Sequence, residues 1–225
     1  ITALGSVAAQ IEAEADPQQV MEVLGDALLQ IGLYSLVILK SPGSEQMKVH
    51  YHTISPRLVK NVDDLFRVAI TEIAISRESF GLYEQVVDQR KPVYCQALMA
   101  NLTRIYPVIT QQQVEKMQVK EDEKKFKAYF LPLSVGEEMV GVLMLWGFDL
   151  SEEDLPSAMI FASQIAIALE NARLYHEALK ASERRIVLHQ ASQELNTLLE
   201  PQEIYRAIHR SVQRLMPCEA FAIGL

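Results

Sequence analysis

The chain has 225 residues, of which 21 are Lys or Arg and 29 are Asp or Glu, so its formal net charge is −8. This acidic balance excludes a dedicated nucleic-acid binder, because phosphate backbones are bound by basic surfaces that release counterions. The hydrophobic fraction of 49% and the charged fraction of 22% predict a folded chain with a buried core.

The cysteine content and the apolar segments bear on the compartment. Cys95 and Cys218 are too few for a disulfide framework and show no zinc-type Cys/His spacing, which favours a reducing, cytoplasmic setting without a metal site. The longest apolar stretch, 139–148, has about half the length of a membrane-spanning helix, so we expect no membrane contact. The first residues show no charged n-region followed by an apolar h-region, so we expect no signal peptide. Because it starts at Ile1 and ends inside the apolar run 221–225, we expect a piece of a longer protein.

Residues 17–31 are predicted to form the first helix. Asp16 is a typical N-cap residue, and Pro17 occupies the first helical position, where its missing N–H costs nothing. Apolar residues then recur at helical spacing until Gly32, a common helix stop.

The next stretch predicts strands followed by irregular helices. The continuous apolar run 36–39 indicates a buried strand, and alternation over 47–53 indicates its hairpin partner. Helix-like patterns cover 56–70 and 79–89, and 93–95 reads as a short strand.

The C-terminal part of this unit carries the clearest pattern. Residues 96–125 show little periodicity, although the charged stretch 114–125 could form an exposed helix. Residues 129–135 and 139–146 then form a predicted hairpin around a glycine turn, and a long helix runs from about 152 to beyond 185. Clustered strands joined by hairpins predict an α+β domain with an antiparallel sheet.

An internal repeat is visible at an offset of 184 positions. The segment 16–18 (Asp-Pro-Gln) returns as 200–202 (Glu-Pro-Gln), and the apolar positions that follow coincide as well. Residues from about 187 onward therefore resemble the opening of a second copy of the first unit, which stops inside its expected first strand at 220–223.

Several motifs of the first unit resemble those of GAF domains. The last hairpin carries three of them, and two more flank it: 131–133 (Leu-Pro-Leu), 136–137 (Gly-Glu), 140–143 (Val-Gly-Val-Leu), 90–93 (Arg-Lys-Pro-Val) and 170–175 (Glu-Asn-Ala-Arg-Leu-Tyr). The resemblance covers about residues 6–175. It implies a PAS-like antiparallel sheet of five or six strands, with terminal helices on one face and a ligand pocket on the other. With the internal repeat, the truncated second copy would be another GAF opening, and tandem GAF domains joined by a helix typically occur in sensor histidine kinases, diguanylate cyclases and related regulators.

We therefore divide the chain into three parts. Residues 1–175 are predicted to be a GAF domain, 176–190 a signalling-helix linker, and 191–225 the truncated start of a second GAF domain.

The chemistry of known GAF subclasses is not matched by these residues. The segment 122–127 differs from the Asn-Lys-x-Phe-Asp-Glu type motif of cyclic-nucleotide-binding members, and Cys95 is followed by Gln96 rather than the histidine that bilin-binding members usually carry. Methionine-sulfoxide reductases of this fold use three cysteines, whereas Cys218 falls in the second copy. We expect no catalytic residues and no metal ligands, and the cofactor stays unknown.

Four residues are candidates for lining a ligand pocket: Tyr94, Cys95, His50 and His52. The first two lie where a short strand meets the expected pocket, and the two histidines are placed by alternation on one face of the second strand. Two imidazoles are short of a zinc site, although one could be an axial haem ligand. The alternatives are a core cysteine and two half-exposed histidines.

The long helix carries a heptad pattern that predicts a partner helix. Its two apolar positions fall on 165, 172, 179 and 186 and on 168, 175, 182 and 189. Beyond residue 173 we expect no sheet for this stripe to cover. We therefore predict a parallel homodimer with an interface at Ala172, Tyr175, Leu179 and Ile186.

These observations predict a sensor from a bacterial, cytoplasmic signal-transduction protein of the two-component type. A GAF domain would bind a small molecule and pass the state of its pocket, through a coiled-coil helix, to a histidine kinase or diguanylate cyclase output domain. The alternative is a constitutive dimerisation module with an empty pocket. A small-molecule enzyme of GAF fold is disfavoured by the cysteine count.

Overall fold

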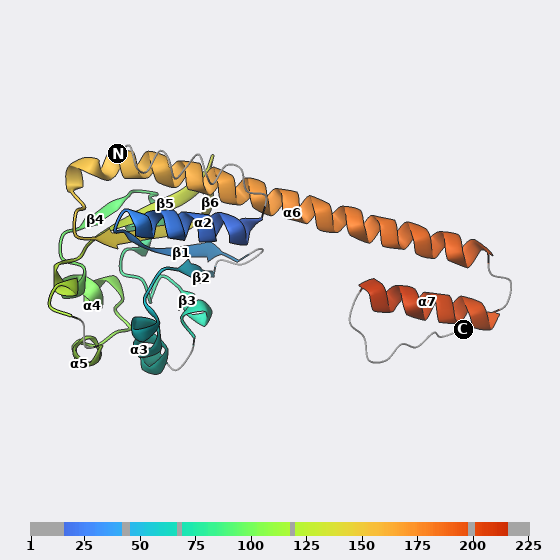
Figure 1. The fold of residues 1–225 in the computed structure, drawn as a ribbon, viewed down its shortest axis with the longest axis horizontal. Helices are drawn as coiled ribbons and strands as arrows, with labels where there is room; N and C mark the ends of the chain where they lie inside the picture. The colour runs from blue at the N-terminus through green and yellow to red at the C-terminus, as the bar shows by residue number, and fades with distance from the viewer. Residues whose placement is uncertain (1–15, 42–45, 67–68, 118–119, 198–200, 216–225) are drawn as a thin grey trace. The chain divides into compact units, whose positions relative to one another are not determined.

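The computed structural model describes residues 16–41, 46–66, 69–117, 120–197 and 201–215 (Figure 1). The chain divides into two compact units, residues 1–172 and residues 173–225. The sequence-based boundaries at 175 and 190 both fall within one helix, α6 (Leu155–Thr197).

A six-stranded antiparallel sheet forms the centre of the first unit, in agreement with the expected five or six strands. The strands are β1 (Tyr34–Lys40), β2 (Met47–His52), β3 (Ala74–Ile75), β4 (Val93–Cys95), β5 (Lys127–Val135) and β6 (Glu138–Gly147). They lie in the order β3-β2-β1-β6-β5-β4. Both predicted hairpins, β1–β2 and β5–β6, are confirmed, and antiparallel pairing of β1 with β6 joins them in the middle of the sheet.

Two helices cover one face of this sheet (Figure 1). Helix α2 (Pro17–Gln30) begins as predicted, because the Asp16 side chain accepts a hydrogen bond of 2.7 Å from the Gln18 N–H. The first turns of α6 follow a 3₁₀ turn at Glu152–Asp154. The core on this side joins both helices to inward-facing strand residues, including Leu24, Leu28, Val37, Leu131, Leu143, Leu145, Phe161 and Ile165. Alternation along each strand sends the intervening residues to the other face.

Short helices and loops cover the opposite face. They are α3 (Pro56–Phe66), α4 (Leu102–Ile105), α5 (Gln111–Lys116), 3₁₀ helices at Ile70–Glu72, Met99–Asn101 and Glu123–Lys125, and a π-helical turn at Glu84–Asp88. The helix expected over 79–89 is therefore shorter than predicted. The reason is tertiary: the Gly81 N–H donates to the Ile105 carbonyl at 2.8 Å, far along the chain, instead of joining a helical ladder.

The second unit contains the rest of α6 and helix α7 (Pro201–Leu215). Pro201 begins α7 at the same offset of 184 positions from Pro17, which begins α2. The strand predicted at 220–223, like Cys218, lies outside the described residues, so the second GAF copy stays a prediction. No helix in the described ranges combines the length and the apolarity that crossing a bilayer requires.

Candidate ligand pocket

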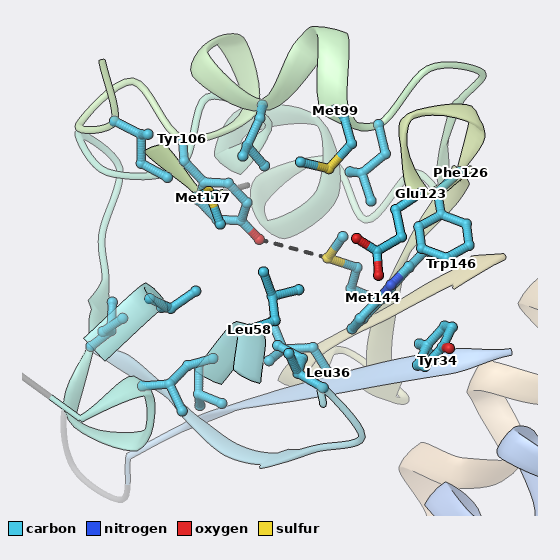
Figure 2. Close-up of a pocket in the computed structure, with 18 of the residues that line it drawn as sticks. Tyr34, Leu36, Leu58, Met99, Tyr106, Met117, Glu123, Phe126, Met144 and Trp146 are labelled. Atoms are coloured by element: carbon cyan, nitrogen blue, oxygen red, sulfur yellow. Dashed lines mark hydrogen bonds between the residues drawn. The ribbon is translucent and has the colours of Figure 1, made fainter. Parts of the chain in front are cut away.

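A cavity of about 310 Å³ lies on the face of the sheet opposite α2 and α6. Strands β1 and β6 form its floor through residues such as Leu36 and Met144 (Figure 2), and Val49 of β2 lines it as well. Residues from the covering segments 54–79 and 98–126 close it from the other side. This volume lies at the lower end of the range that small-molecule pockets span, roughly 300–1,000 Å³.

Three aromatic side chains form one wall of the cavity. Tyr34 and Trp146 are cross-strand partners of β1 and β6, and their rings stack with centroids 5.8 Å apart and an interplanar angle of 18°. Phe126 adds a third ring at 5.6 Å from Tyr34. The register of the two central strands thus places two stacked rings on this wall, and the Phe126 ring, tilted by 58° to Tyr34, extends the aromatic surface against which an apolar ligand can pack.

The charged lining residues are Arg57, Lys120 and Glu123. An ion pair with an N···O distance of 3.6 Å joins Arg57 of α3 to Glu123, which also accepts the Lys120 backbone N–H at 2.9 Å. The Arg57 and Glu123 side chains are 49% and 25% exposed, so this cluster lies on the solvent side of the cavity. With two cations and one carboxylate, the cluster carries one net positive charge, and Arg57 is the cation paired with Glu123.

The side chain of Tyr106, a residue between α4 and α5, places its hydroxyl inside the cavity. This hydroxyl donates a hydrogen bond of 3.7 Å to the sulfur of Met144 (Figure 2). Burial raises the pKa of Tyr106 above its ordinary value, so the hydroxyl stays protonated and acts as a donor. Met99 and Met117 also line the cavity, which gives it adaptable walls.

The cover of the cavity is held by bonds between segments far apart in the sequence. The Asn61 side-chain amide donates to the Met117 carbonyl at 2.9 Å, and the Leu98 N–H donates to the Phe126 carbonyl at 2.9 Å. Sequence reasoning missed this cover because 96–125 shows little overall periodicity. A signal was present nevertheless, since four buried residues there recur at helical spacing: Leu98, Leu102, Ile105 and Ile109.

The structure places the two candidate histidines outside the cavity lining. Val49 opposes Ile38 while Tyr51 opposes Val37, so His50 is an extra residue in a β-bulge and the alternation that predicted a shared face is interrupted there. Burial lowers the pKa of both histidines, with Asp63 partly opposing the effect at His52. The buried Nδ1 of His52 has no hydrogen-bond partner among the described residues. Across those residues no group of three or more potential ligands could hold a metal ion.

Tyr94 and Cys95 lie on β4, the predicted short strand at the edge of the sheet. They line a second, more open cavity of about 370 Å³ rather than the aromatic one. The Tyr94 ring packs 5.8 Å from Tyr129, and its hydroxyl donates to the Leu150 carbonyl at 3.4 Å, near the start of α6. Burial raises the pKa of the Cys95 thiol.

The four predicted interface residues differ in exposure. Ala172 is 2% exposed and belongs to the core under α6, so this alanine faces its own domain. Tyr175, Leu179 and Ile186 are 59%, 47% and 55% exposed. Exposure of large apolar side chains along one helix is typical of a surface that a partner covers, so the dimer stays a prediction.

Comparisons with known proteins identify the fold. The model of the GAF domain family matches residues 14–170. Solved structures similar to the chain include the GAF domain of a phosphoenolpyruvate-protein phosphotransferase from Coxiella burnetii, with 12% identity over 78% of this chain and 95% of that one and a TM-score of 0.56. Another similar structure is that of residues 122 to 287 of a methyl-accepting chemotaxis protein. It has 12% identity over 77% of this chain and 99% of that one, with a TM-score of 0.53.

A further similar structure is that of an enzyme. Free methionine-R-sulfoxide reductase from Neisseria meningitidis, solved with its substrate, has 13% identity to this chain over 76% of it and 89% of the reductase, with a TM-score of 0.53. At these identities the likenesses establish a shared fold and nothing about ligands. A search of curated proteins finds no match.

Proposed function

Because the chain belongs to the GAF domain family, we propose that its first unit is a small-molecule-binding regulatory domain of a signal-transduction protein. The ligand occupies the aromatic cavity of about 310 Å³ between the sheet and its cover. The observation that carries the proposal is this cavity: it is mostly apolar, with few polar groups, which is the usual composition of a ligand site.

The geometry offers a route from the cavity to helix α6. On β6, Met144 and Trp146 face the cavity, whereas Leu143 and Leu145, which alternate with them, belong to the core under α6. Close-packed cores transmit small displacements, so a ligand that shifts β6 also changes the packing of α6. At its start this helix is tied to the sheet, because Tyr129 accepts from the Ser151 N–H at 3.1 Å and donates to its carbonyl.

The finer part of the proposal concerns the intact protein. Helix α6 passes the state of the pocket to an output domain of the histidine kinase or diguanylate cyclase type, in a bacterial cytoplasm. Ligand binding then biases an equilibrium between two packings of α6 and acts at a distance through it. The chain itself has no catalytic role, and methionine-sulfoxide turnover that depends on Cys95 would contradict this.

The single tryptophan, Trp146, lines the cavity and supplies the test. Toluene, an apolar probe that small protein cavities accommodate, is titrated while Trp146 emission and the thermal unfolding midpoint are followed. We expect both to change in the wild type and in the exposed-surface control Ile167→Phe. The cavity-filling variant Ile54→Phe should show neither change. Equal responses in the two variants would refute binding in this cavity.

The alternative, a constitutive dimerisation module, rests on the exposed side chains of α6. We propose a parallel homodimer through Leu179 and its neighbours, and Leu179→Glu should then give a monomer by sedimentation velocity. Ala181→Glu is the matched variant, because it lies about 200° around the same helix and is also exposed. Dissociation by Ala181→Glu alone would instead assign the interface to the opposite face, which carries the exposed Ile160 and Ile167.

The two functions predict different states of the purified protein. Native mass spectrometry of a sensor should reveal a retained small molecule, or an added one that changes the dimer. A constitutive module should give the same apo dimer under every condition.

A further inference from the structure

We propose that the ligand of the aromatic cavity is an uncharged, largely apolar molecule with one oxygen hydrogen-bond acceptor, and that Tyr106 is the residue that selects it. Ketones, esters, ethers and alcohols belong to this class. The inference rests on the proposed function, since it names the ligand class of the same cavity.

The first argument is the weak partner of the Tyr106 hydroxyl. A thioether sulfur is a poor hydrogen-bond acceptor, and the hydroxyl lies 3.7 Å from the sulfur of Met144. Buried hydroxyls in proteins normally have an oxygen or nitrogen partner, because burial without one costs free energy. Tyr106 therefore holds a donor whose better partner is an oxygen atom placed in the cavity beside it.

The second argument is the distribution of charge. The charged lining residues in the described part of the chain are Arg57, Lys120 and Glu123, and Arg57 is already paired with Glu123 on the solvent side. An ion beside Tyr106 would lose its hydration among methionine and aromatic side chains, because the remaining cation, Lys120, is exposed on the solvent side of the cavity. An uncharged oxygen avoids this cost.

The third argument concerns the rest of the ligand. Beyond Tyr106, the wall is formed by the stacked rings of Tyr34 and Trp146 and by the ring of Phe126. A flat apolar body can stack on these rings while its oxygen reaches the phenol. The cavity volume of about 310 Å³ suits a single small ring system with a short substituent.

Four probes on one scaffold test the inference by isothermal titration calorimetry on the full chain: acetophenone, its hydrocarbon isostere α-methylstyrene, benzoate and benzylamine. We expect acetophenone to bind the wild type about 2- to 13-fold more tightly than α-methylstyrene, the ratio that one ordinary hydrogen bond contributes. Benzoate and benzylamine should bind more weakly than acetophenone. In Tyr106→Phe the preference for the ketone should disappear, while α-methylstyrene keeps its affinity.

Met144→Leu is the matched variant, because it removes the sulfur acceptor at similar volume. It should keep or increase the preference for acetophenone, since the phenol then loses its partner in the free protein. Equal binding of acetophenone and α-methylstyrene to the wild type, an unchanged ratio in Tyr106→Phe, or tightest binding of a charged probe would overturn the inference and leave a ligand pocket in place. Failure of all four probes to bind the wild type would overturn the proposed function as well.

Discussion

Gly141 lies in the central strand β6, where β1 approaches it closely on one side. A Cβ atom at this position would lie 2.1 Å from the Ile38 carbonyl oxygen and 3.0 Å from the Leu39 Cα. Real Cβ contacts are essentially never shorter than 3.0 Å, so Gly141→Ala forces the backbones of two paired strands apart. This explains physically why the Val-Gly-Val-Leu segment of the last hairpin needs its glycine.

The cost can be worked out from this geometry. Overpacking a well-packed interior costs about 1–3 kcal/mol, and separating β1 from β6 also weakens the ladder bonds beside Gly141, each of which contributes about 0.5–1.5 kcal/mol. We expect Gly141→Ala to lower the free energy of unfolding by roughly 3–5 kcal/mol. For a domain of this size that is a loss of roughly 6–20 °C in the unfolding midpoint.

The assay is urea unfolding followed by the fluorescence of Trp146. This residue is the only tryptophan of the chain and lies in the first unit, so the signal reports on that unit. Gly136 in the β5–β6 turn is the matched control: its φ is +58° and nothing lies within 4 Å of its Cβ position. Gly136→Ala should cost only the left-handed strain of about 1–2 kcal/mol, and Gly136→Asn less. If Gly141→Ala is no more destabilising than Gly136→Ala, the close approach of β1 and β6 is wrong.

Three further outcomes follow from hydrogen bonding and burial in the first unit. Tyr129→Phe should cost about 1–3 kcal/mol in urea unfolding, because the Ser151 N–H and carbonyl lose their partner at the start of α6. Burial lowers the pKa of His52 from 6.5, so the fold favours its neutral form and stability should fall as the pH drops below about 6.5. His52→Gln should flatten that loss between about pH 7 and 5, and an unchanged pH profile would contradict it. Because burial raises the pKa of Cys95, its alkylation by iodoacetamide near neutral pH, resolved by peptide mass spectrometry, should be slower than that of glutathione.

The amino-acid sequence by itself determined most of the secondary structure of the first unit. The N-cap at Asp16, the hairpins, the short strand at 93–95 and the long helix are read correctly because capping and hydrophobic periodicity act over a few neighbouring residues. The motifs of the last hairpin also pointed to the family. Two of their positions require glycine: Gly136 has a positive φ, and Gly141 lies too close to β1 for a Cβ atom.

Only the tertiary structure decided where the candidate site lies. The cavity is a space left between side chains from separate segments, and no local period encodes such a gap. The bulge at His50 and the burial of Ala172 likewise depend on partners across the sheet. Tyr106 meets Met144 only because the cover folds over β6, 38 residues away in the sequence. Contacts of this kind depend on packing between distant segments, which alternation within one segment cannot specify.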